Sequence, residues 1–448
     1  MDLKDKKIVV IGMGRTGIET AQFLGTKGAH VAVTDEKPRK QWGAGFEQMA
    51  ADHGRLTVGR YGVDILKAAD MVVPSPGVPP HNDILRAAQG KNIPVISEVE
   101  LAAEFLQTPL IVITGTNGKT TTTTLLGRIM ERAGKKVFVG GNIGDPLIGC
   151  LLSGKKLDYI VAEISSFQLQ WTKKFRPFVA VLLNVTCDHV DYHGSFAEYR
   201  RVKAKVFANQ TKADFALLNA DDATQEGMDS AIRARLFRFS SRAKLEKGIY
   251  LSGDKIICRG LTGGDEEYPL AMIKIPGRHN AENVMAAILT ARFCGCSRED
   301  IIAAVDDFRG LPHRIEFAGE VNGIKFYDDS KGTNVGSVER ALQTFTEPVV
   351  LLLGGRDKDG DFDTLQPLLA ERTKQVVLFG EARDRIGSLI GNGVPVEKKE
   401  TLKEAILSAY KKAVSGDVVL LSPGCASFDE FKNYKERGDF FKEVVRNL

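Results

Sequence analysis

The sequence predicts an α/β protein with three domains built on mainly parallel sheets. Its 448 residues are too many for one ordinary hydrophobic core. Apolar runs lead through glycine-containing turns toward helical segments in each part of the chain, at residues 7–17, 110–124 and 349–358. Strands that alternate with helices in this way form parallel, doubly wound sheets. We expect the domains to cover residues 1–97, 98–310 and 311–448.

Composition argues against several classes of function. The chain has 61 basic and 57 acidic residues and a net charge of +4, a near balance that disfavours a dedicated nucleic-acid or membrane surface. No apolar run reaches the length of a membrane span, and the N-terminus lacks a signal-peptide pattern. The six cysteines have no paired metal-ligand spacing. We therefore expect reduced thiols in a cytoplasmic protein.

The first domain is predicted to be Rossmann-like. Residues 7–11 form an apolar strand, Gly12-Met-Gly-Arg-Thr-Gly17 leads into a helix, and residues 30–34 form a strand that ends at Asp35. Glycines let a diphosphate approach a helix N-terminus, and Asp35 could accept hydrogen bonds from a ribose, a combination that by itself favours NAD. Another strand ends in Val72-Val-Pro-Ser-Pro-Gly77. This turn either contacts a ligand at the edge of the sheet or only makes the loop rigid.

Residues 110–124 are the most informative stretch of the chain. The apolar strand 110–114 runs directly into Gly115-Thr-Asn-Gly-Lys-Thr-Thr121 and a helix. The two glycines let backbone N–H groups converge on an anion, Lys119 can neutralise outer phosphates, and the Thr120 hydroxyl is suitably placed for Mg²⁺. The general phosphate-loop pattern is matched only in part, because this loop is shorter. The alternative is an ordinary polar turn.

Polar side chains also follow other strands of the predicted central sheet, which we expect to resemble that of a P-loop ATPase. Glu163 follows the apolar run 157–162, and His189 lies in the segment after the run 178–183. A carboxylate and a histidine at strand ends can bind a nucleotide-associated Mg²⁺. A solvated acid and a histidine that binds no metal remain the alternatives.

Two helices of the central domain carry further candidates. Residues 195–209 predict an amphipathic helix, in which Lys203 falls four residues after Tyr199 and would by itself be an ordinary solvated lysine. A second helix begins near Pro276 and presents Asn280 and Asn283 on one face. Such amides bind an adenine edge or a phosphate, but they also serve as helix caps.

The C-terminal domain is predicted to be a Rossmann-like, doubly wound sheet. Arg314 near its start could reach the phosphates of a nucleotide, and Tyr327-Asp-Asp-Ser-Lys-Gly-Thr-Asn334 is a polar cluster at a strand end. The buried strand from Val349 leads to Lys358, which is suitably placed for a carboxylate. The last strand is followed by Ser422-Pro-Gly-Cys-Ala-Ser-Phe-Asp-Glu-Phe431.

These motifs together resemble the Mur ligase family of peptidoglycan synthesis, and the resemblance covers nearly the whole chain. It rests on Gly115–Thr121, on Asn184-Val-Thr-Cys-Asp-His189 and on Asp329-Ser-Lys-Gly-Thr-Asn334. The stretch Ser422–Phe431 is similar to that of the D-glutamate-adding branch rather than the diamino-acid-adding one. The resemblance implies an ATP-dependent ligase that adds D-glutamate to UDP-N-acetylmuramoyl-L-alanine through an acyl phosphate.

The resemblance also implies roles for individual residues. Catalysis would fall to Lys119, Glu163, His189 and Lys203. Two Mg²⁺ ions would be held by Thr120, Glu163, His189 and Lys203, the last carrying a CO₂-derived carbamate. ATP would contact Gly115, Thr116, Asn117, Gly118, Lys119, Thr120, Thr121, Asn280, Asn283, Arg314, Asp329 and Lys331. The UDP substrate would contact Arg15, Thr16, Asp35, Ser75, Gly77, Asn142, Ser165 and Gln168. D-glutamate would contact Thr333, Lys358, Ser427 and Tyr434, where the family usually has phenylalanine. We expect a monomer without nucleic-acid partners or membrane insertion.

Other functions remain open. A folylpolyglutamate-synthetase-like ligase would share the phosphate loop and the last domain, but it normally lacks a glycine-rich unit like Gly12–Gly17. An NAD-dependent dehydrogenase or a non-catalytic nucleotide-binding regulator would require only the Rossmann fingerprint and none of the motifs in the later domains. The combination of Glu163, His189 and Lys331 disfavours both of these.

Overall fold

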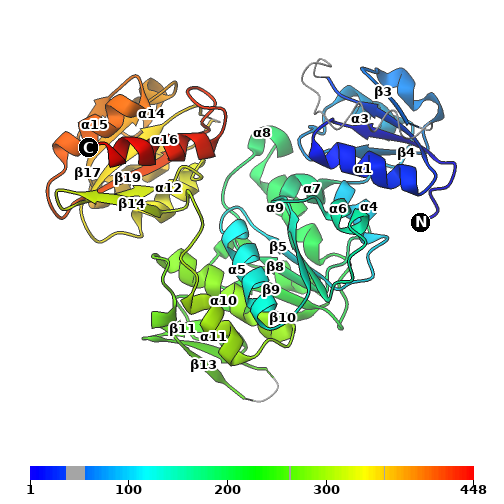
Figure 1. Ribbon diagram of the computed structural model, residues 1–448, viewed down its shortest axis with the longest axis horizontal. Helices are drawn as coiled ribbons and strands as arrows, with labels where there is room; N and C mark the ends of the chain where they lie inside the picture. Colours follow the sequence, from blue (N-terminus) through cyan, green and yellow to red (C-terminus); the bar gives the residue numbers. More distant parts are fainter. Residues whose placement is uncertain (37–55, 262–263, 358) are drawn as a thin grey trace. The chain divides into compact units, whose positions relative to one another are not determined.

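A computed structural model describes residues 1–36, 56–261, 264–357 and 359–448, and its strands form three sheets within these ranges (Figure 1). The predicted α/β class with mostly parallel sheets is confirmed. The chain forms two compact units, one of residues 1–270 with 283–305 and one of residues 271–282 with 306–448. None of the helices in these ranges combines the length and apolar character that crossing a membrane requires.

The smaller sheet of the first unit is parallel throughout and has the strand order β3-β2-β1-β4. Its strands are β1 (Lys7–Ile11), β2 (His30–Thr34), β3 (Leu56–Gly59) and β4 (Met71–Pro74). Alternate residues of a strand point to opposite faces. Ile8 and Val10 therefore pack in one cluster with Leu24 of helix α1, whereas Val9 packs in another with Leu85 of α3.

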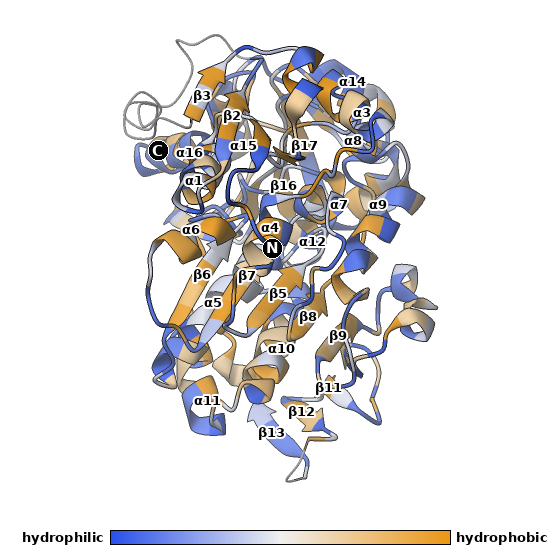
Figure 2. Ribbon diagram, turned by 90° about the vertical axis from the view of Figure 1, so that its right-hand side faces the viewer, coloured by the Kyte–Doolittle hydropathy of each residue, from blue (hydrophilic) through white to orange (hydrophobic). Residues whose placement is uncertain are grey.

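The central sheet of the first unit has the order β13-β12-β11-β10-β9-β8-β5-β7-β6. The strands are β5 (Leu110–Thr114), β6 (Val137–Gly141), β7 (Tyr159–Glu163), β8 (Val179–Leu182), β9 (Phe215–Asn219), β10 (Arg235–Ser240), β11 (Gly248–Ser252), β12 (Lys255–Arg259) and β13 (Glu266–Pro269). Pairing is parallel from β6 to β11 and antiparallel from there to β13. Figure 2 shows the apolar character of β5 and β8, which is expected of parallel strands buried on both faces.

Helices connect and cover these strands. The chain up to residue 306 contains α1 (Arg15–Thr26), α3 (Asp83–Gly90), α4 (Glu98–Ala103), α5 (Lys119–Arg132), α6 (Leu147–Leu152), α7 (Ser166–Gln170), α8 (Val190–His193), α9 (Phe196–Ala204), α10 (Arg278–Phe293) and α11 (Arg298–Asp306). Helix α1 packs on α6, and Leu24 and Leu147 lie in the same buried cluster as Ile160 of β7. The two sheets of the first unit therefore share one hydrophobic core.

The second unit contains a six-stranded sheet with the order β14-β15-β19-β16-β17-β18, antiparallel at β14–β15 and parallel elsewhere. The strands are β14 (Glu316–Val321), β15 (Ile324–Asp328), β16 (Val349–Gly354), β17 (Thr373–Phe379), β18 (Val396–Lys398) and β19 (Val418–Gly424). Helices α12 (Val335–Leu342), α13 (Gln366–Arg372) and α14 (Arg383–Leu389) pack in one cluster with Leu351, and α15 (Leu402–Lys412) and α16 (Tyr434–Arg446) in another with Leu352. These helices thus cover opposite faces of the sheet, as a doubly wound domain requires.

Candidate active site

The predicted phosphate loop lies between β5 and α5 and is fixed by the neighbouring strand β8. The Thr116 N–H donates to the Asn184 carbonyl at 2.8 Å, and the Asn184 side chain bonds the Asn117 backbone N–H and carbonyl at 2.9 and 3.0 Å. Gly118 has a left-handed backbone with φ +86°, and an added Cβ would collide with the Asn283 side-chain oxygen. A side chain at position 118 is therefore excluded on two grounds. Thr120 lies in the first turn of α5, the positive end of the helix.

Two lysine amines meet at one carbonyl of this loop. Lys119 Nζ donates to the carbonyl oxygens of Gly115 at 2.9 Å and of Thr116 at 2.8 Å. Lys203 Nζ, on α9, donates to the same Gly115 oxygen at 2.8 Å and lies 4.5 Å from the centre of the Tyr199 ring. Lys203 is 1% exposed. Burial holds its pKa well below the ordinary value, and the nearby Lys119 charge lowers the pKa further.

Glu163 is the last residue of β7, whereas the sequence placed it just after the strand. Its side chain is 2% exposed, and one carboxylate oxygen accepts a 2.7 Å hydrogen bond from the Asn142 amide. The other oxygen is buried and has no hydrogen-bond partner. A buried carboxylate oxygen without a partner is costly, and a cation supplies the missing interaction. This oxygen is therefore suited to bind Mg²⁺.

His189 is the N-cap residue of the single-turn helix α8 and has φ +54°, a left-handed conformation that is uncommon for residues other than glycine. Its ring centre lies 4.7 Å from that of Phe167 and 6.3 Å from that of Tyr199. Nε2 lies 3.7 Å from the Asp188 carboxylate. The ring is partly exposed and close to Tyr199, whose hydroxyl shares a 3.0 Å hydrogen bond with the Thr116 hydroxyl. The phosphate loop, Lys203 and His189 thus share contacts through Tyr199.

The residues predicted to bind UDP are divided between the two sheets of the first unit. Arg15 begins α1, but its guanidinium pairs with Glu19 at 2.8 Å and with Asp145, so it is not a free cation. Thr16 lies beside it in the first turn. Asp35 accepts a 2.7 Å hydrogen bond from the Met13 N–H and so shapes the glycine-rich loop.

The remaining predicted UDP contacts are mostly engaged in local structure. The Ser75 hydroxyl is buried without a partner at the Pro-Gly turn that also contains Gly77. Ser165 and Gln168 form a capping box at the start of α7, in which each side chain bonds the other residue's backbone N–H. Asn142 donates to Glu163. Lys358, predicted to bind D-glutamate, lies outside the described residues.

Several of the remaining predicted residues gather in the second unit. Asp329 is buried and accepts a 2.8 Å hydrogen bond from the Ser422 hydroxyl, and burial raises its pKa to about 7 while the charge of Arg314 opposes that rise. Lys331 Nζ lies 4.0 Å from the centre of the Tyr434 ring, at the first residue of α16. Ser427 is buried, in the segment between β19 and α16.

Thr333 lies in the loop before α12. The Asn280 side-chain amide donates to the Pro276 carbonyl at 2.6 Å. Asn283, in contrast, lies against Gly118 of the phosphate loop. The two amides therefore have different surroundings, although they lie three residues apart on one helix.

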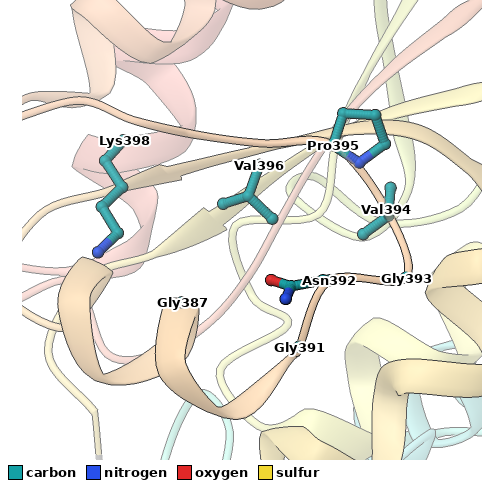
Figure 3. Close-up of a pocket in the computed structure, with 8 residues that line it drawn as sticks. All are labelled: Gly387, Gly391, Asn392, Gly393, Val394, Pro395, Val396 and Lys398. Atoms are coloured by element: carbon teal, nitrogen blue, oxygen red, sulfur yellow. The ribbon is translucent and has the colours of Figure 1, made fainter.

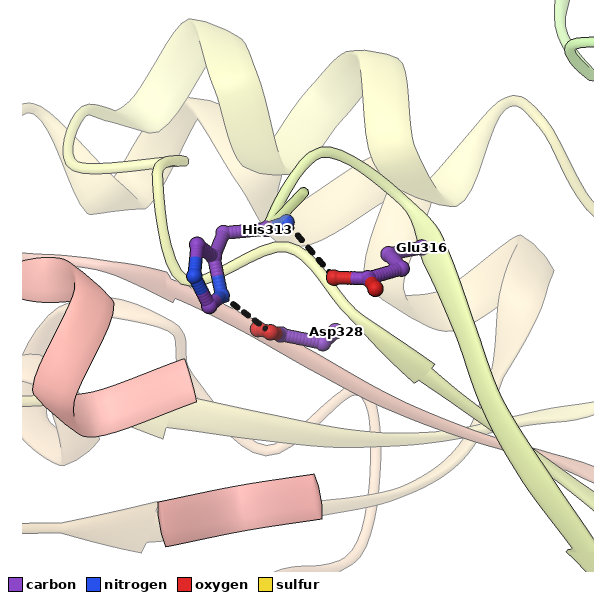
Figure 4. A group of neighbouring side chains, drawn as sticks. All are labelled: His313, Glu316 and Asp328. Carbon is purple, nitrogen blue, oxygen red and sulfur yellow. Dashed lines mark hydrogen bonds and ion pairs between the residues drawn. The ribbon is translucent and has the colours of Figure 1, made fainter. Parts of the chain in front are cut away.

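A buried group that the sequence did not assign lies beside Arg314. The ring of His313 bonds the Asp328 carboxylate at 2.7 Å, and the His313 backbone N–H donates to Glu316 at 2.8 Å (Figure 4). His313 and Ile315 both have left-handed backbones, with φ +64° and +48°. Lys442 also pairs with Glu316 at 3.1 Å. Asp328 thus holds the His313 ring and Glu316 holds its backbone, and these contacts fix the turn that carries Arg314.

His193 is another residue without a predicted role. Its Nε2 lies 2.9 Å from the Ser166 hydroxyl, its Nδ1 is buried without a partner, and its ring centre is 5.3 Å from that of Tyr199. Burial lowers its pKa to about 4, so the ring is neutral near pH 7.

A separate hollow of about 590 Å³ lies beside the edge strand β18, lined by Gly391, Pro395 and Lys398 among others (Figure 3). None of the predicted site residues lines it.

Comparison with known proteins gives matches over most of the chain. Residues 6–97 match the description "Mur ligase MurD-like, N-terminal domain", residues 113–291 match "Mur ligase middle domain", and residues 313–425 match "Mur ligase, glutamate ligase domain". The chain is 54% identical over 447 residues to UDP-N-acetylmuramoylalanine--D-glutamate ligase of Syntrophus aciditrophicus, covering 100% of this chain and 99% of that protein.

Solved structures share the fold. A pseudomurein peptide ligase type C from Methanothermus fervidus matches with a TM-score of 0.62 and 20% identity, over 99% of this chain and 100% of that one. The MurF ligase of Thermotoga maritima, solved in complex with ADP, matches with a TM-score of 0.61 and 16% identity, over 99% and 96% of the two chains.

Proposed function

The chain belongs to the Mur ligase family, and we propose that it joins D-glutamate to UDP-N-acetylmuramoyl-L-alanine at the expense of ATP. The single observation that carries this proposal is the 54% identity to a ligase of that name over the full length of the chain. The phosphate loop, with Lys119, Lys203 and Glu163 around it, provides the chemistry that such a ligase needs. The reaction belongs to the synthesis of peptidoglycan precursors.

We propose the following division of roles. The residues assigned to ATP are Gly115, Thr116, Asn117, Gly118, Lys119, Thr120, Thr121, Asn280, Asn283, Arg314, Asp329 and Lys331. The UDP substrate is bound by Arg15, Thr16, Asp35, Ser75, Gly77, Asn142, Ser165 and Gln168, and D-glutamate by Thr333, Lys358, Ser427 and Tyr434. The corresponding domains are residues 1–97, 98–310 and 311–448.

Amide formation from a carboxylate requires activation, because a carboxylate is a poor electrophile. A carboxylate oxygen of the alanyl group attacks the γ-phosphorus of ATP, the bond to the bridging oxygen breaks, and ADP leaves. The amine of D-glutamate then attacks the acyl carbon, phosphate leaves, and the amine loses a proton. Negative charge accumulates where the carboxylate meets the γ-phosphate, and Lys119 is suited to offset it.

Mg²⁺ would be held by Thr120, Glu163 and His189, with Lys203 as a carbamate at a second ion. Bound there, the ions would supply Lewis-acid stabilisation of the phosphate charge. The unpartnered oxygen of Glu163 supports the first part of this proposal. The low pKa of Lys203 supports the second, because only a neutral amine adds to CO₂.

The substrates of this reaction, ATP and a nucleotide sugar, point to a cytoplasmic enzyme, and we propose that it acts as a monomer. The decisive experiment measures ADP release with each of several amino acids, with and without UDP-N-acetylmuramoyl-L-alanine. We expect release only when D-glutamate and the UDP substrate are both present. Release that follows a different amino acid, or that needs no UDP substrate, would refute the proposal. A change in NADH fluorescence on binding would instead favour the dehydrogenase alternative.

A further inference from the structure

One hydrogen bond connects the Pro-Gly turn of the smaller sheet to helix α8 of the larger one. The Tyr192 hydroxyl donates to the Val78 carbonyl at 3.1 Å, and these residues lie 114 positions apart in the sequence. Val78 directly follows Gly77, a proposed UDP contact. Tyr192 lies three residues after His189, a proposed metal ligand. The bond therefore connects two sites to which we have assigned opposite ends of one substrate.

The turn at Val78 is fixed to the rest of the smaller sheet. The Val78 N–H donates to the Ser75 carbonyl at 3.0 Å, and the Ser75 N–H donates to the Ile11 carbonyl at 2.7 Å. A Cβ at Gly12 would come within 2.7 Å of the Ser75 hydroxyl oxygen, so the turn packs closely on the glycine-rich loop. The Val78 carbonyl therefore has a fixed position relative to both elements proposed to hold the UDP group.

Helix α8 is equally constrained around Tyr192. The helix has a single turn and lies between left-handed residues, His189 with φ +54° and Gly194 with φ +79°. The Tyr192 N–H donates to the His189 carbonyl at 3.2 Å. The Tyr192 ring centre lies 4.2 Å from that of Phe167, which in turn lies 4.7 Å from that of His189. A shift of the Tyr192 hydroxyl would therefore be transmitted to the His189 ring by both backbone and ring contacts.

We propose that Tyr192 is a positioning residue that sets the span between the UDP-binding turn at Ser75–Val78 and His189. This inference rests on the proposed function, because it assigns the two ends of that span to the two ends of the UDP substrate. The substrate must reach from the turn to the site where its carboxylate is activated. Fixing the length of that span before binding removes a conformational cost that binding would otherwise carry.

The test is Tyr192→Phe, which keeps the ring packing and removes only the hydroxyl. We expect KM for UDP-N-acetylmuramoyl-L-alanine to rise about 2- to 10-fold, which is the factor that corresponds to the net free energy of one hydrogen bond. KM for ATP should be unchanged. The loss in kcat/KM should shrink with N-acetylmuramoyl-L-alanine lacking the UDP group, because that substrate occupies only one end of the span. Tyr410→Phe is the matched control, since its hydroxyl accepts a 2.6 Å hydrogen bond from Asn322 at the surface.

The outcomes separate this inference from the proposed function. A variant with ligase activity and unchanged constants would overturn the inference alone. An equal loss with the full and the truncated substrate would also overturn it, because a local structural defect does not depend on the UDP group. Absence of ligase activity in the unaltered chain would overturn the proposed function and this inference with it. The melting temperature, measured for each variant, identifies any loss that comes from unfolding.

Discussion

Replacing Glu163 by glutamine tests the proposed metal site most directly. The substitution keeps the size of the side chain and an oxygen that can accept the 2.7 Å hydrogen bond from Asn142. It changes the other carboxylate oxygen, which is buried and has no partner, into an amide nitrogen. An amide nitrogen cannot bind a cation. The variant therefore removes a ligand and a negative charge while leaving the surrounding contacts in place.

The expected loss follows from what that oxygen does. Removing one group that stabilises transition-state charge costs about 3 kcal/mol. At 1.36 kcal/mol for each factor of ten, kcat should fall roughly 100-fold. The free energy of unfolding should decrease by at most about 1 kcal/mol, and it can rise, because a neutral amide is less costly to bury than a carboxylate.

The assay measures ADP release at saturating substrates over a range of Mg²⁺ concentrations, together with urea denaturation. Glu267→Gln is the control, because Glu267 forms an exposed ion pair with Lys255 at 2.7 Å on the hairpin of β12 and β13. We expect the control to keep full activity and an unchanged Mg²⁺ requirement. A folded Glu163→Gln enzyme with kcat within about 3-fold of the parent, a difference below 1 kcal/mol, would refute the assignment of Glu163 as a metal ligand.

Three further predictions concern buried or loop-bound charges. Lys119→Ala should lower ligase turnover at least about 100-fold with an unchanged circular dichroism spectrum, because its amine is held at the phosphate loop; near-normal turnover would contradict this role. Lys203→Ala should be inactive and should regain part of its ADP release when formate or acetate is added, since an anion is what the site would lack; no rescue by any short carboxylate would count against the carbamate. Burial raises the pKa of Glu98 from 4.5 to about 7, so between these pH values the folded chain binds a proton that the unfolded chain does not. The free energy of unfolding therefore falls as the pH rises through this range. Glu98→Gln should therefore raise the free energy of unfolding by about 3 kcal/mol more near pH 8 than near pH 4, as measured by urea denaturation, and an equal effect at both pH values would contradict this linkage.

The strands were accessible from the sequence because buried parallel strands are continuous apolar runs. The runs 7–11 and 30–34 coincide with β1 and β2. The expected helix at 195–209 was less accurate, because α9 ends at Ala204 and continues as a 3-10 turn to Phe207. The antiparallel strands β12 and β13 were not anticipated, since they are short and neither alternates regularly between apolar and polar residues.

Sequence analysis identified candidate site residues where a polar side chain lies close to the end of an apolar strand, as at Lys119 and Glu163. Residues that act through contacts distant in sequence were missed. Asn184 was quoted only as part of a motif, although it holds the phosphate loop from the adjacent strand. The signal was present, because an amide at the end of a strand next to β5 lies at the same sheet edge. The pairing of His313 with Asp328 had no such signal, since it depends on the register of β15 with the turn before β14.

Lys203 shows why the fold was needed to understand the chemistry. As one lysine on an amphipathic helix it gives no sign of its state. In the folded chain it is buried and donates to the same carbonyl oxygen as Lys119. Burial holds the pKa of Lys203 well below its ordinary value, and the neighbouring Lys119 charge lowers it further, because two ammonium groups at one oxygen repel each other strongly in a buried setting. Both effects favour the neutral amine. A neutral amine can take up CO₂ and release a proton, and the resulting anion would be attracted to the charge of Lys119. The cost of burying Lys203 as a cation is thus the physical reason why this position suits a carbamate.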